Sequence, residues 1–251
     1  MNRHAITVFL LMAATSTCRA QGSTATDGQW HISVSPYLWL IGLHGIAGAD
    51  QRTVSVHASP ADLLSNFRFG LMGTTLIRRN RFVAPIDVIW ARLADDKALP
   101  PTALGTTSAD FKASLFVLTP AIGYRIIDQQ KIKVEAFTGF RYWHFGQTLE
   151  FNPSRLGLSF NGSQNWVDPL VGGRIELPLS PRLAVSIFGD VGGWGAGSQL
   201  DYQIAGILSY KWKPKWALQA GWRYLDVDYR GTAVYDAAMS GVLFGVTYSM
   251  K

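Results

Sequence analysis

The chain contains few of the residues on which most active sites and metal sites depend. It has one cysteine, Cys18, and five histidines among its 251 residues, and only 16% of its residues are charged. Beyond the N-terminal region, no apolar stretch approaches the roughly 18 residues that a membrane-spanning helix needs. A single cysteine cannot form an internal disulfide, and no histidine or cysteine cluster has the spacing of a zinc site. These absences exclude a disulfide-linked scaffold and a bundle of membrane helices.

Residues 1–20 have the features of a secretory signal peptide. The basic residue Arg3 precedes the apolar run Ala5–Ala14, and a small residue, Ala20, ends the segment. Cleavage after Ala20 would remove Cys18, so the mature chain would contain no thiol. The alternatives are a cytosolic N-terminal strand or helix and a lipoprotein signal at Cys18, and both fit this pattern less well.

The chain is therefore expected to have three parts: a signal peptide (1–20), a flexible N-terminal segment (21–28) and one barrel domain (29–251). Its length suffices for one barrel and little else. Loss of the signal peptide lowers the formal charge from +6 to about +4, because two arginines and no acidic residue leave with it. This mild basicity does not favour a nucleic-acid partner.

The strongest positive signal is an alternation of period 2 within Trp216–Met250. Apolar or aromatic residues occupy every second position, as in Trp216, Leu218, Ala220, Trp222 and Tyr224, and again in Val242, Phe244, Val246 and Tyr248. This period indicates β-strands, because successive side chains point to opposite faces. The strands exceed the roughly 5–6 residues usual in soluble proteins. Aromatic residues near strand ends are typical of strands that cross a bilayer.

The predicted fold is all-β, a transmembrane antiparallel up-and-down β-barrel. Short turns alternate with longer loops, as at the periplasmic and outer ends of such barrels. The strands are expected at Trp30–Ile41, Phe67–Arg79, Phe82–Leu93, Phe111–Ile127, Ile132–Leu149, Trp166–Leu177, Leu183–Trp194, Leu200–Trp212, Trp216–Asp228 and a last strand after Asp236. That makes about ten strands, with eight and twelve as alternatives. Counting Thr53–His57 would make eleven, whereas two periplasmic termini require an even number.

Two features interrupt the strands early in the chain. The glycine- and alanine-rich stretch Gly42–Gln51 is predicted to form a loop. Ser59 followed by Pro60 and Asp62 predicts a helix start, giving one short helix near residues 60–65. We favour a helix that caps a loop over a helix that sits in the mouth of the barrel.

Three segments resemble a family of small, mostly uncharacterised Gram-negative outer-membrane barrel proteins. The first is Trp30-x-x-Ser33-x-x-Pro36-Tyr37-Leu38-Trp39-x-x-Gly42-x-x-Gly45, the second runs from Ala61 to Gly73, and the third is the run Gly221-Trp222-Arg223-Tyr224-Leu225-Asp226-Val227-Asp228-Tyr229. The resemblance covers nearly all of the mature chain and implies the barrel fold and the outer membrane. It carries over no catalytic or ligand-binding residue.

Charged residues alternate with the apolar face and are expected to point into the lumen. On the lipid face, an Arg or Lys at mid-bilayer would cost roughly 2–4 kcal/mol. The expected lumen charge network contains six acids and six bases: Arg68, Asp87, Lys133, Glu135, Arg141, Asp168, Arg174, Glu176, Asp190, Asp201, Lys211 and Arg223. A ten-stranded barrel is close to the size that side chains can fill. We favour ion pairs that hold the barrel shut, with a narrow polar pore as the alternative.

The phase of the last two strands follows from the same alternation. Leu218, Trp222, Val242 and Phe244 should face lipid, and Gln219, Arg223 and Gly245 should face the lumen. The last strand should close against the first in antiparallel orientation, because an open edge in lipid leaves backbone groups unpaired. Tyr248 would then stand in for the terminal aromatic residue of many outer-membrane barrels.

The sequence gives little support for catalysis. The four histidines of the mature chain are His31, His44, His57 and His144, and none has a serine and a carboxylate placed as in a triad. The acidic pairs Asp95-Asp96 and Asp226/Asp228 suit solvated loop acids or cation ligands that bridge lipopolysaccharide. No glycine-rich loop introduces a helix, so a phosphate cradle is unsupported.

We therefore expect a non-catalytic outer-membrane barrel with a structural or interaction role and no cofactor. Its expected partners are outer-membrane lipid, lipopolysaccharide and, during insertion, the barrel-assembly machinery. The alternatives are a porin-like small-solute channel and an enzyme that hydrolyses lipid or peptide. The sequence indicates no small-molecule ligand.

We predict that residues 1–20 are removed and that the mature chain fractionates with the outer membrane. Mass spectrometry of the N-terminus and sucrose-gradient separation of the membranes measure the two parts. Recovery of the full-length chain in the cytosolic fraction would contradict both.

Overall fold

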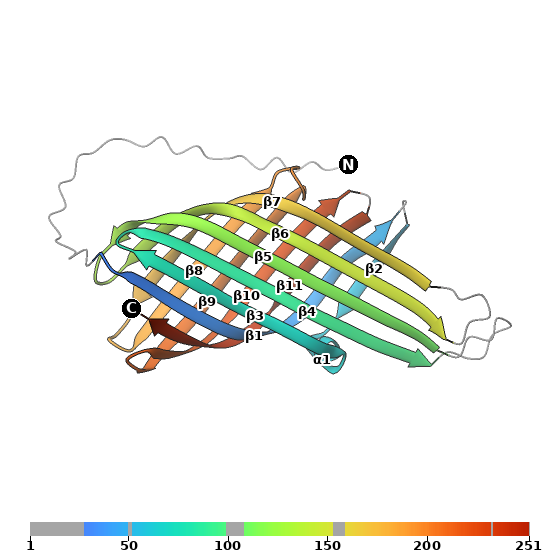
Figure 1. Ribbon diagram of the computed structural model, residues 1–251, viewed down its shortest axis with the longest axis horizontal. Helices are drawn as coiled ribbons and strands as arrows, with labels where there is room; N and C mark the ends of the chain where they lie inside the picture. The colour runs from blue at the N-terminus through green and yellow to red at the C-terminus, as the bar shows by residue number, and fades with distance from the viewer. Residues whose placement is uncertain (1–27, 50–51, 99–107, 153–158, 232, 251) are drawn as a thin grey trace.

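A computed structural model describes residues 28–49, 52–98, 108–152, 159–231 and 233–250 (Figure 1). The predicted signal peptide and nearly all of the segment 21–28 lie outside these ranges. The elements are β1 (Trp30–Ala49), β2 (Arg52–Ala58), α1 (Pro60–Ser65), β3 (Phe67–Arg79), β4 (Phe82–Ala98), β5 (Ser108–Asp128), β6 (Lys133–Asn152), β7 (Ser159–Pro178), β8 (Leu183–Gly193), β9 (Leu200–Lys213), β10 (Trp216–Arg230) and β11 (Ala233–Met250). Among the described residues, no helix is long and apolar enough to cross a membrane.

The strands form one closed antiparallel barrel. Neighbours in sequence are neighbours in the sheet from β3 to β11, and β11 returns to pair with β1. The ring contains β1 and β3 through β11, which is ten strands, and β2 pairs only with the outer part of β1. The prediction of a ten-stranded up-and-down barrel is confirmed, and the eleventh strand is the short segment that the parity argument had set aside.

Closure of the ring joins the first and last strands along almost their whole length. The register runs from Ile32 opposite Met250 to Ala49 opposite Ala233. Near the periplasmic end, the Ser33 and Ser249 hydroxyl oxygens lie 3.1 Å apart. The predicted antiparallel pairing of the first and last strands is confirmed.

The predicted periplasmic ends of the strands agree with the structure, but the strands run further outward than expected. The prediction of a loop at Gly42–Gln51 was wrong, because β1 continues to Ala49. A Cβ on Gly45 would clash with the carbonyl of Asp236 in β11, so this glycine permits close approach of two strands rather than a turn. The longer loops predicted after β4, β6 and β10 are also shortened, since backbone pairing continues beyond the side-chain alternation.

The side chains of the last two strands face outward and inward as predicted. Leu218, Trp222, Val242 and Phe244 are between 44% and 53% exposed on the outside, whereas Arg223 is 2% exposed. Gln219 and Gly245 are opposite each other and share the inward face with Arg223. A closed barrel with an apolar outer band is suited to lipid, because the ring closes through β1 and β11 and carbon faces the acyl chains.

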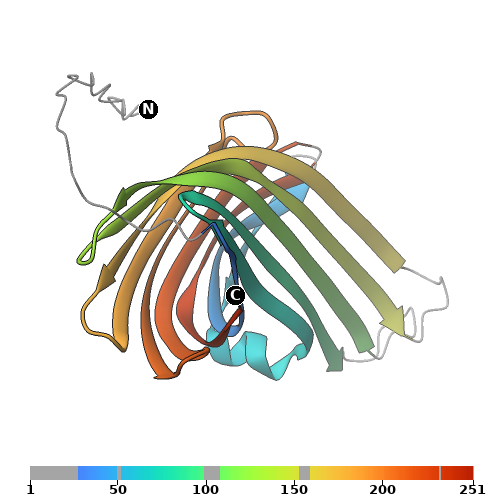
Figure 2. The same ribbon diagram turned by 60° about the vertical axis from the view of Figure 1, so that its left-hand side comes forward.

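The helix α1 begins as predicted but lies in an unexpected place. Ser59 is the N-cap, and its side chain and that of Asp62 form a reciprocal capping box. Hydrogen bonds from Ser59 lower the pKa of the Asp62 carboxyl group. The helix lies between the β1–β2 hairpin and β3 and contacts β1 (Figure 2). It therefore covers part of the barrel wall rather than only capping a loop.

Closure can be tested with two cysteines in the mature chain. Directly opposed residues of an antiparallel pair have Cα atoms about 4.5–5.5 Å apart, within the range of a disulfide. Ser33→Cys with Ser249→Cys should therefore cross-link within one molecule on mild oxidation, as seen by a mobility shift on non-reducing gels. The control pair Ser35→Cys with Ser249→Cys is offset by two residues and should cross-link poorly. Equal yields from the two pairs would contradict this register.

Candidate functional site

The lumen of the barrel is the candidate site, and its side chains form three layers along the axis. The layer nearest the chain termini, here called the periplasmic cluster, is charged and contains Arg78, Arg125, Asp128, Lys133, Glu135, Arg174 and Glu176. The middle layer, here called the central network, contains Tyr37, Thr74, Asp87, Thr119, Arg141, Asp190, Asp201, Gln203 and Arg223. The third is an outer apolar layer. A strand contributes inward side chains to successive layers, because residues two apart along it share a face.

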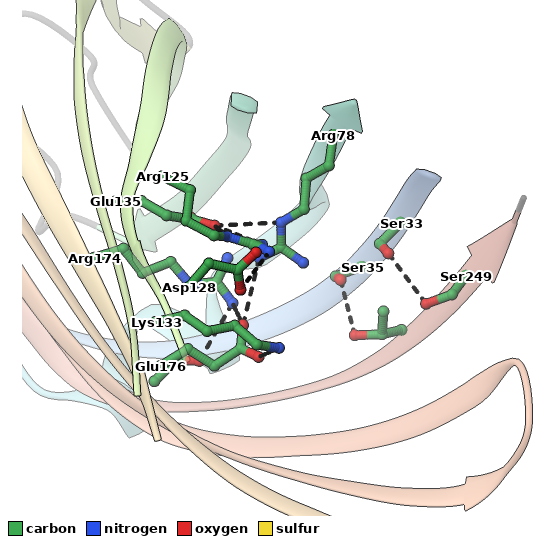
Figure 3. Close-up of polar contacts among 12 residues, drawn as sticks. Ser33, Ser35, Arg78, Arg125, Asp128, Lys133, Glu135, Arg174, Glu176 and Ser249 are labelled. Carbon is green, nitrogen blue, oxygen red and sulfur yellow. Dashed lines mark hydrogen bonds and ion pairs between the residues drawn. The ribbon is translucent and has the colours of Figure 1, made fainter. Parts of the chain in front are cut away.

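The periplasmic cluster is a set of ion pairs on one side of the lumen. Glu135 accepts from Arg125 at 3.0 Å, and Glu176 accepts from Lys133 at 3.0 Å. Figure 3 shows these groups on β3 and β5 to β7, with small hydroxyl residues on β1 and β11 on the opposite side. The Lys133 side chain is 29% exposed. This end of the lumen is therefore accessible to water, and its ion pairs are partly screened.

Arg141 is the first of two arginines at the centre of the central network. Its guanidinium donates to Asp201, to Asp190 at 2.8 Å and to the Thr119 hydroxyl at 3.1 Å. The side chains of Arg141 and Asp201 are 0% exposed. Two carboxylates and a hydroxyl satisfy this buried cation, as a charge removed from water requires.

Arg223 is the second central arginine. It donates to Asp87 at 2.9 Å, to the Tyr37 hydroxyl at 2.8 Å and to Gln203 at 2.9 Å. The Tyr37 hydroxyl donates in turn to Asp87 at 2.9 Å. Gln203 donates to Asp190, which also accepts from Arg141, and so joins the two arginines.

The central network crosses the lumen. Its side chains come from β1, β3, β4, β5, β6, β8, β9 and β10, which are eight of the ten strands of the ring. The hydrogen bonds run without a break from Thr74, through Asp87 and Arg223, to Arg141. In a low-dielectric interior such bonds are strong, and the loss of one partner leaves another group unsatisfied.

Above the central network, tryptophans form the base of the outer apolar layer. The indole N–H of Trp143 donates to Asp201 at 3.3 Å, that of Trp166 donates to Asp168 at 3.0 Å, and that of Trp39 donates to the Gly241 carbonyl at 3.2 Å. Trp143 and Trp166 are stacked, with ring centroids 5.6 Å apart. The layer is completed by Met72, Ile89, Val117, Leu225, Val227, Ala233, Tyr235, Met239 and Leu243. The rings of Trp143 and Trp166 thus turn their polar edges toward the acids.

Ten of the twelve predicted lumen charges lie inside the barrel. The pairings bring together Asp87 with Arg223, Arg141 with Asp190 and Asp201, and Lys133 and Arg174 with Glu176. Asp168 instead accepts from the backbone N–H and the hydroxyl of Ser198, at 2.6 and 2.7 Å. The structure does not describe the side chain of Arg68. Lys211 is exposed near the periplasmic end of β9.

Sequence reasoning missed two lumen arginines, Arg78 and Arg125. Both ion-pair with Glu135, and Arg78 also pairs with Glu176. They lie beside periplasmic turns, where a charge is ordinarily solvated, yet their alternation with the apolar face would have revealed them. Among the described side chains, these two join Lys133, Arg141, Arg174 and Arg223, so six bases lie with the six predicted acids.

The residues considered for catalysis have other partners. The Nδ1 atoms of His44 and His57 lie 2.9 Å apart on the β1–β2 hairpin, and His144 contacts Asn165 at 2.6 Å. Asp226 accepts from Tyr224 at 2.7 Å, and Asp228 accepts from Arg230 at 2.8 Å. The side chains of residues 95 and 96 are not described. Over the described ranges, no three His, Cys, Asp or Glu residues are grouped so as to hold a metal ion.

The central network can be tested by a double-mutant cycle. Asp87→Asn and Arg223→Gln should each lower the free energy of unfolding by about 3–5 kcal/mol, because each leaves a buried charge unpaired. The double variant should lose less than the sum. Reversible urea unfolding of the refolded barrel gives these values. The solvent-exposed pair Arg230→Gln and Asp228→Asn is the matched control and should show no measurable coupling, and additivity at the buried pair would contradict the proposed coupling.

Comparisons with known proteins bear on the fold. No protein-family model matches the chain, and no curated protein matches it, so the family resemblance of its motifs stays a prediction. Its structure is similar to the outer-membrane protease OmpT from Escherichia coli, with a TM-score of 0.58 and 12% identity over 90% of this chain and 98% of that chain.

Two further solved structures are similar at lower TM-scores. The attachment invasion locus protein Ail of Yersinia pestis has a TM-score of 0.40 and 12% identity over 88% of this chain and 99% of that chain. The translocator domain of the autotransporter NalP from Neisseria meningitidis has a TM-score of 0.43 and 12% identity over 89% of this chain and 90% of that chain. The likeness to OmpT shows the fold of an outer-membrane barrel. With the closed ring and the apolar outer band, this makes the chain an outer-membrane β-barrel protein.

Proposed function

We propose that the protein is a non-catalytic outer-membrane barrel with a sealed lumen and a structural or interaction role at the membrane surface. The observation that carries the proposal is the central network, in which Arg141 and Arg223 are held by partners on opposite sides of the lumen. The Arg141, Asp190, Asp201 and Arg223 side chains are at most 3% exposed.

The outer apolar layer adds a second barrier in series with the central network. An ion that passed the arginines would next meet Trp39, Trp143 and Leu225, which are buried. Because an ion loses its hydration there without gaining a polar partner, transfer through this layer is strongly unfavourable. The two layers together favour a sealed barrel over the alternative of a small-solute channel.

The outer surface supports an interaction with the anionic groups of lipopolysaccharide. Arg92 is exposed on β4, and its guanidinium lies 5.2 Å from the centre of the Trp90 ring. Lys112 is exposed on the neighbouring strand β5, opposite Ala94. Basic side chains beside an interfacial aromatic residue are suited to phosphate groups at a membrane surface. This pair supports the proposed interaction role.

The seal is tested by planar-bilayer conductance of the purified mature barrel. The wild type should give no stepwise conductance. The double variant Arg223→Ala, Trp39→Ala should conduct, because it removes two groups that lie one above the other, 5.1 Å apart, in the two barriers. Variant Arg230→Ala is the control for loss of an arginine, and heat-modifiable gel mobility checks folding. Steady conductance steps from the wild type would contradict the proposal, as would a silent but folded double variant.

A further inference from the structure

The barrel wall is interrupted on one side of β1. On that side β1 pairs with β3 only as far as Pro36, whose partner is Gly73, and with β2 only from Leu43 onward. Within the described ranges, no register pair joins residues 37–42 to β2 or β3, and residues 67–72 pair only with β4. Pro36 has no backbone N–H to donate to a ladder, which suits the point where the two strands separate.

The helix α1 covers this interruption (Figure 2). At its start, the Pro60 Cδ lies 3.5 Å from the position that a Cβ on Gly42 would occupy, so the proline ring rests against β1. After its end, the carbonyl of Asn66 accepts from the backbone N–H of Ala94 in β4 at 2.9 Å. None of the helical residues is buried, and Leu64 is 55% exposed. The helix is thus a cover attached at both ends rather than a part of the packed interior.

A cavity of about 200 Å³ runs from beneath α1 into the outer apolar layer. Leu63 and Leu64 line it from the helix, Leu38 and Leu40 line it from the edge of β1, and Trp143 lines it from the lumen. Leu38 and Leu40 belong to the outward face of β1, whereas Trp143 points inward. The cavity therefore passes through the wall at the gap between β1 and β3.

The lining of the cavity is suited to hydrocarbon. Among the described residues that line it, none carries a charge, and the hydroxyl groups are those of Ser114 and Tyr235. The indole N–H groups of Trp39, Trp143 and Trp166 are taken by acceptors. A cavity with few polar partners holds water poorly, and an engineered apolar cavity of about 150 Å³ stays dry and binds benzene.

The gap lies at the level of the bilayer. Leu38 is opposite Phe244 and Leu40 is opposite Val242, and Val242 is in turn opposite Trp222. All three of these partners belong to the exposed apolar band. Acyl chains rather than water therefore face the gap, toward the outer end of the band.

We propose that this cavity binds a single hydrocarbon chain, the alkyl or acyl chain of an amphiphile, which enters from the outer leaflet between β1 and β3. A chain suits a passage that leads from Leu38 on the lipid side to Trp143 in the lumen. The polar group of the amphiphile stays at the membrane surface, and α1 covers the inserted chain. This site shares Trp39 and Trp143 with the outer apolar layer, but no residue of the central network lines it, so that barrier of the seal is separate from it.

Photolabelling in lipid nanodiscs tests the proposal with two probes. One is a free fatty acid with a diazirine in its chain, and the other is a phosphatidylcholine that carries the same chain. After irradiation, mass spectrometry should place labels on cavity residues such as Met72 and Met239 as well as on the lipid face. Labelling by the phospholipid indicates a resident membrane lipid, labelling by the fatty acid alone indicates a free amphiphile, and both support the site.

Two pairs of variants distinguish the cavity from the lipid face. Ala237→Phe fills the cavity and should abolish labelling of Met72, whereas Ala220→Phe on the exposed face should not. Leu64→Asp places a charge at the passage and should reduce labelling about tenfold, because the chain would have to pass a carboxylate. Its control is Ser65→Asp on the same helix. Because Leu64 is more than half exposed, this variant should fold even if Ala237→Phe does not.

Labels confined to lipid-facing residues would overturn the proposal. Labelling of Met72 that Leu64→Asp and Ala237→Phe leave unchanged would also overturn it. Conductance should stay absent in all four variants, so a failure of the chain-binding site is distinguishable from a failure of the seal.

Discussion

The need to pair every backbone group in lipid is the constraint on which this structure depends. Each unpaired N–H or C=O in the bilayer costs several kcal/mol, so the sheet must close on itself. Closure takes place on β1, which pairs with β11 along one edge and divides its other edge between β3 and β2. That division leaves residues 37–42 of β1 without a register partner on that edge, and α1 lies over them. The helix and the cavity behind it are thus consequences of how the ring closes.

Closure with ten strands also decides what the interior contains. A ring this narrow is filled by side chains, so each inward charge is brought within reach of the opposite wall. Arg141 and Arg223 are buried at the centre because Asp87, Asp190 and Asp201 converge on them from other strands. The periplasmic cluster is partly exposed, whereas the tryptophans of the outer apolar layer are buried. The resulting order of charged, ion-paired and apolar layers supports a sealed lumen and leaves hydrocarbon-lined space at the outer end.

The sequence pattern was a reliable guide to those structural features that depend only on neighbouring residues. The alternation in β10 placed Trp222 toward lipid and Arg223 toward the lumen, because a strand turns successive side chains to opposite faces. Ser59, Pro60 and Asp62 marked the start of α1, since capping needs only neighbouring residues. The same reasoning failed at Gly45, whose small size serves the approach of β11 rather than a turn. It also overlooked Arg125, because a charge beside a turn is ordinarily solvated.

The sequence by itself determined the fold class, the number of strands in the ring, the face on which most side chains lie, and the start of the short helix. These properties follow from the alternation of side chains along a strand, from the residues that turns prefer and from the cost of charge in lipid. Each of these depends on residues that are close together in the sequence. Only the tertiary structure decided which charges pair, that β1 shares an edge between β2 and β3, and that an apolar cavity opens at that division. Those features depend on the register between strands distant in sequence, such as Tyr37 beside Arg223, and no local pattern encodes that register.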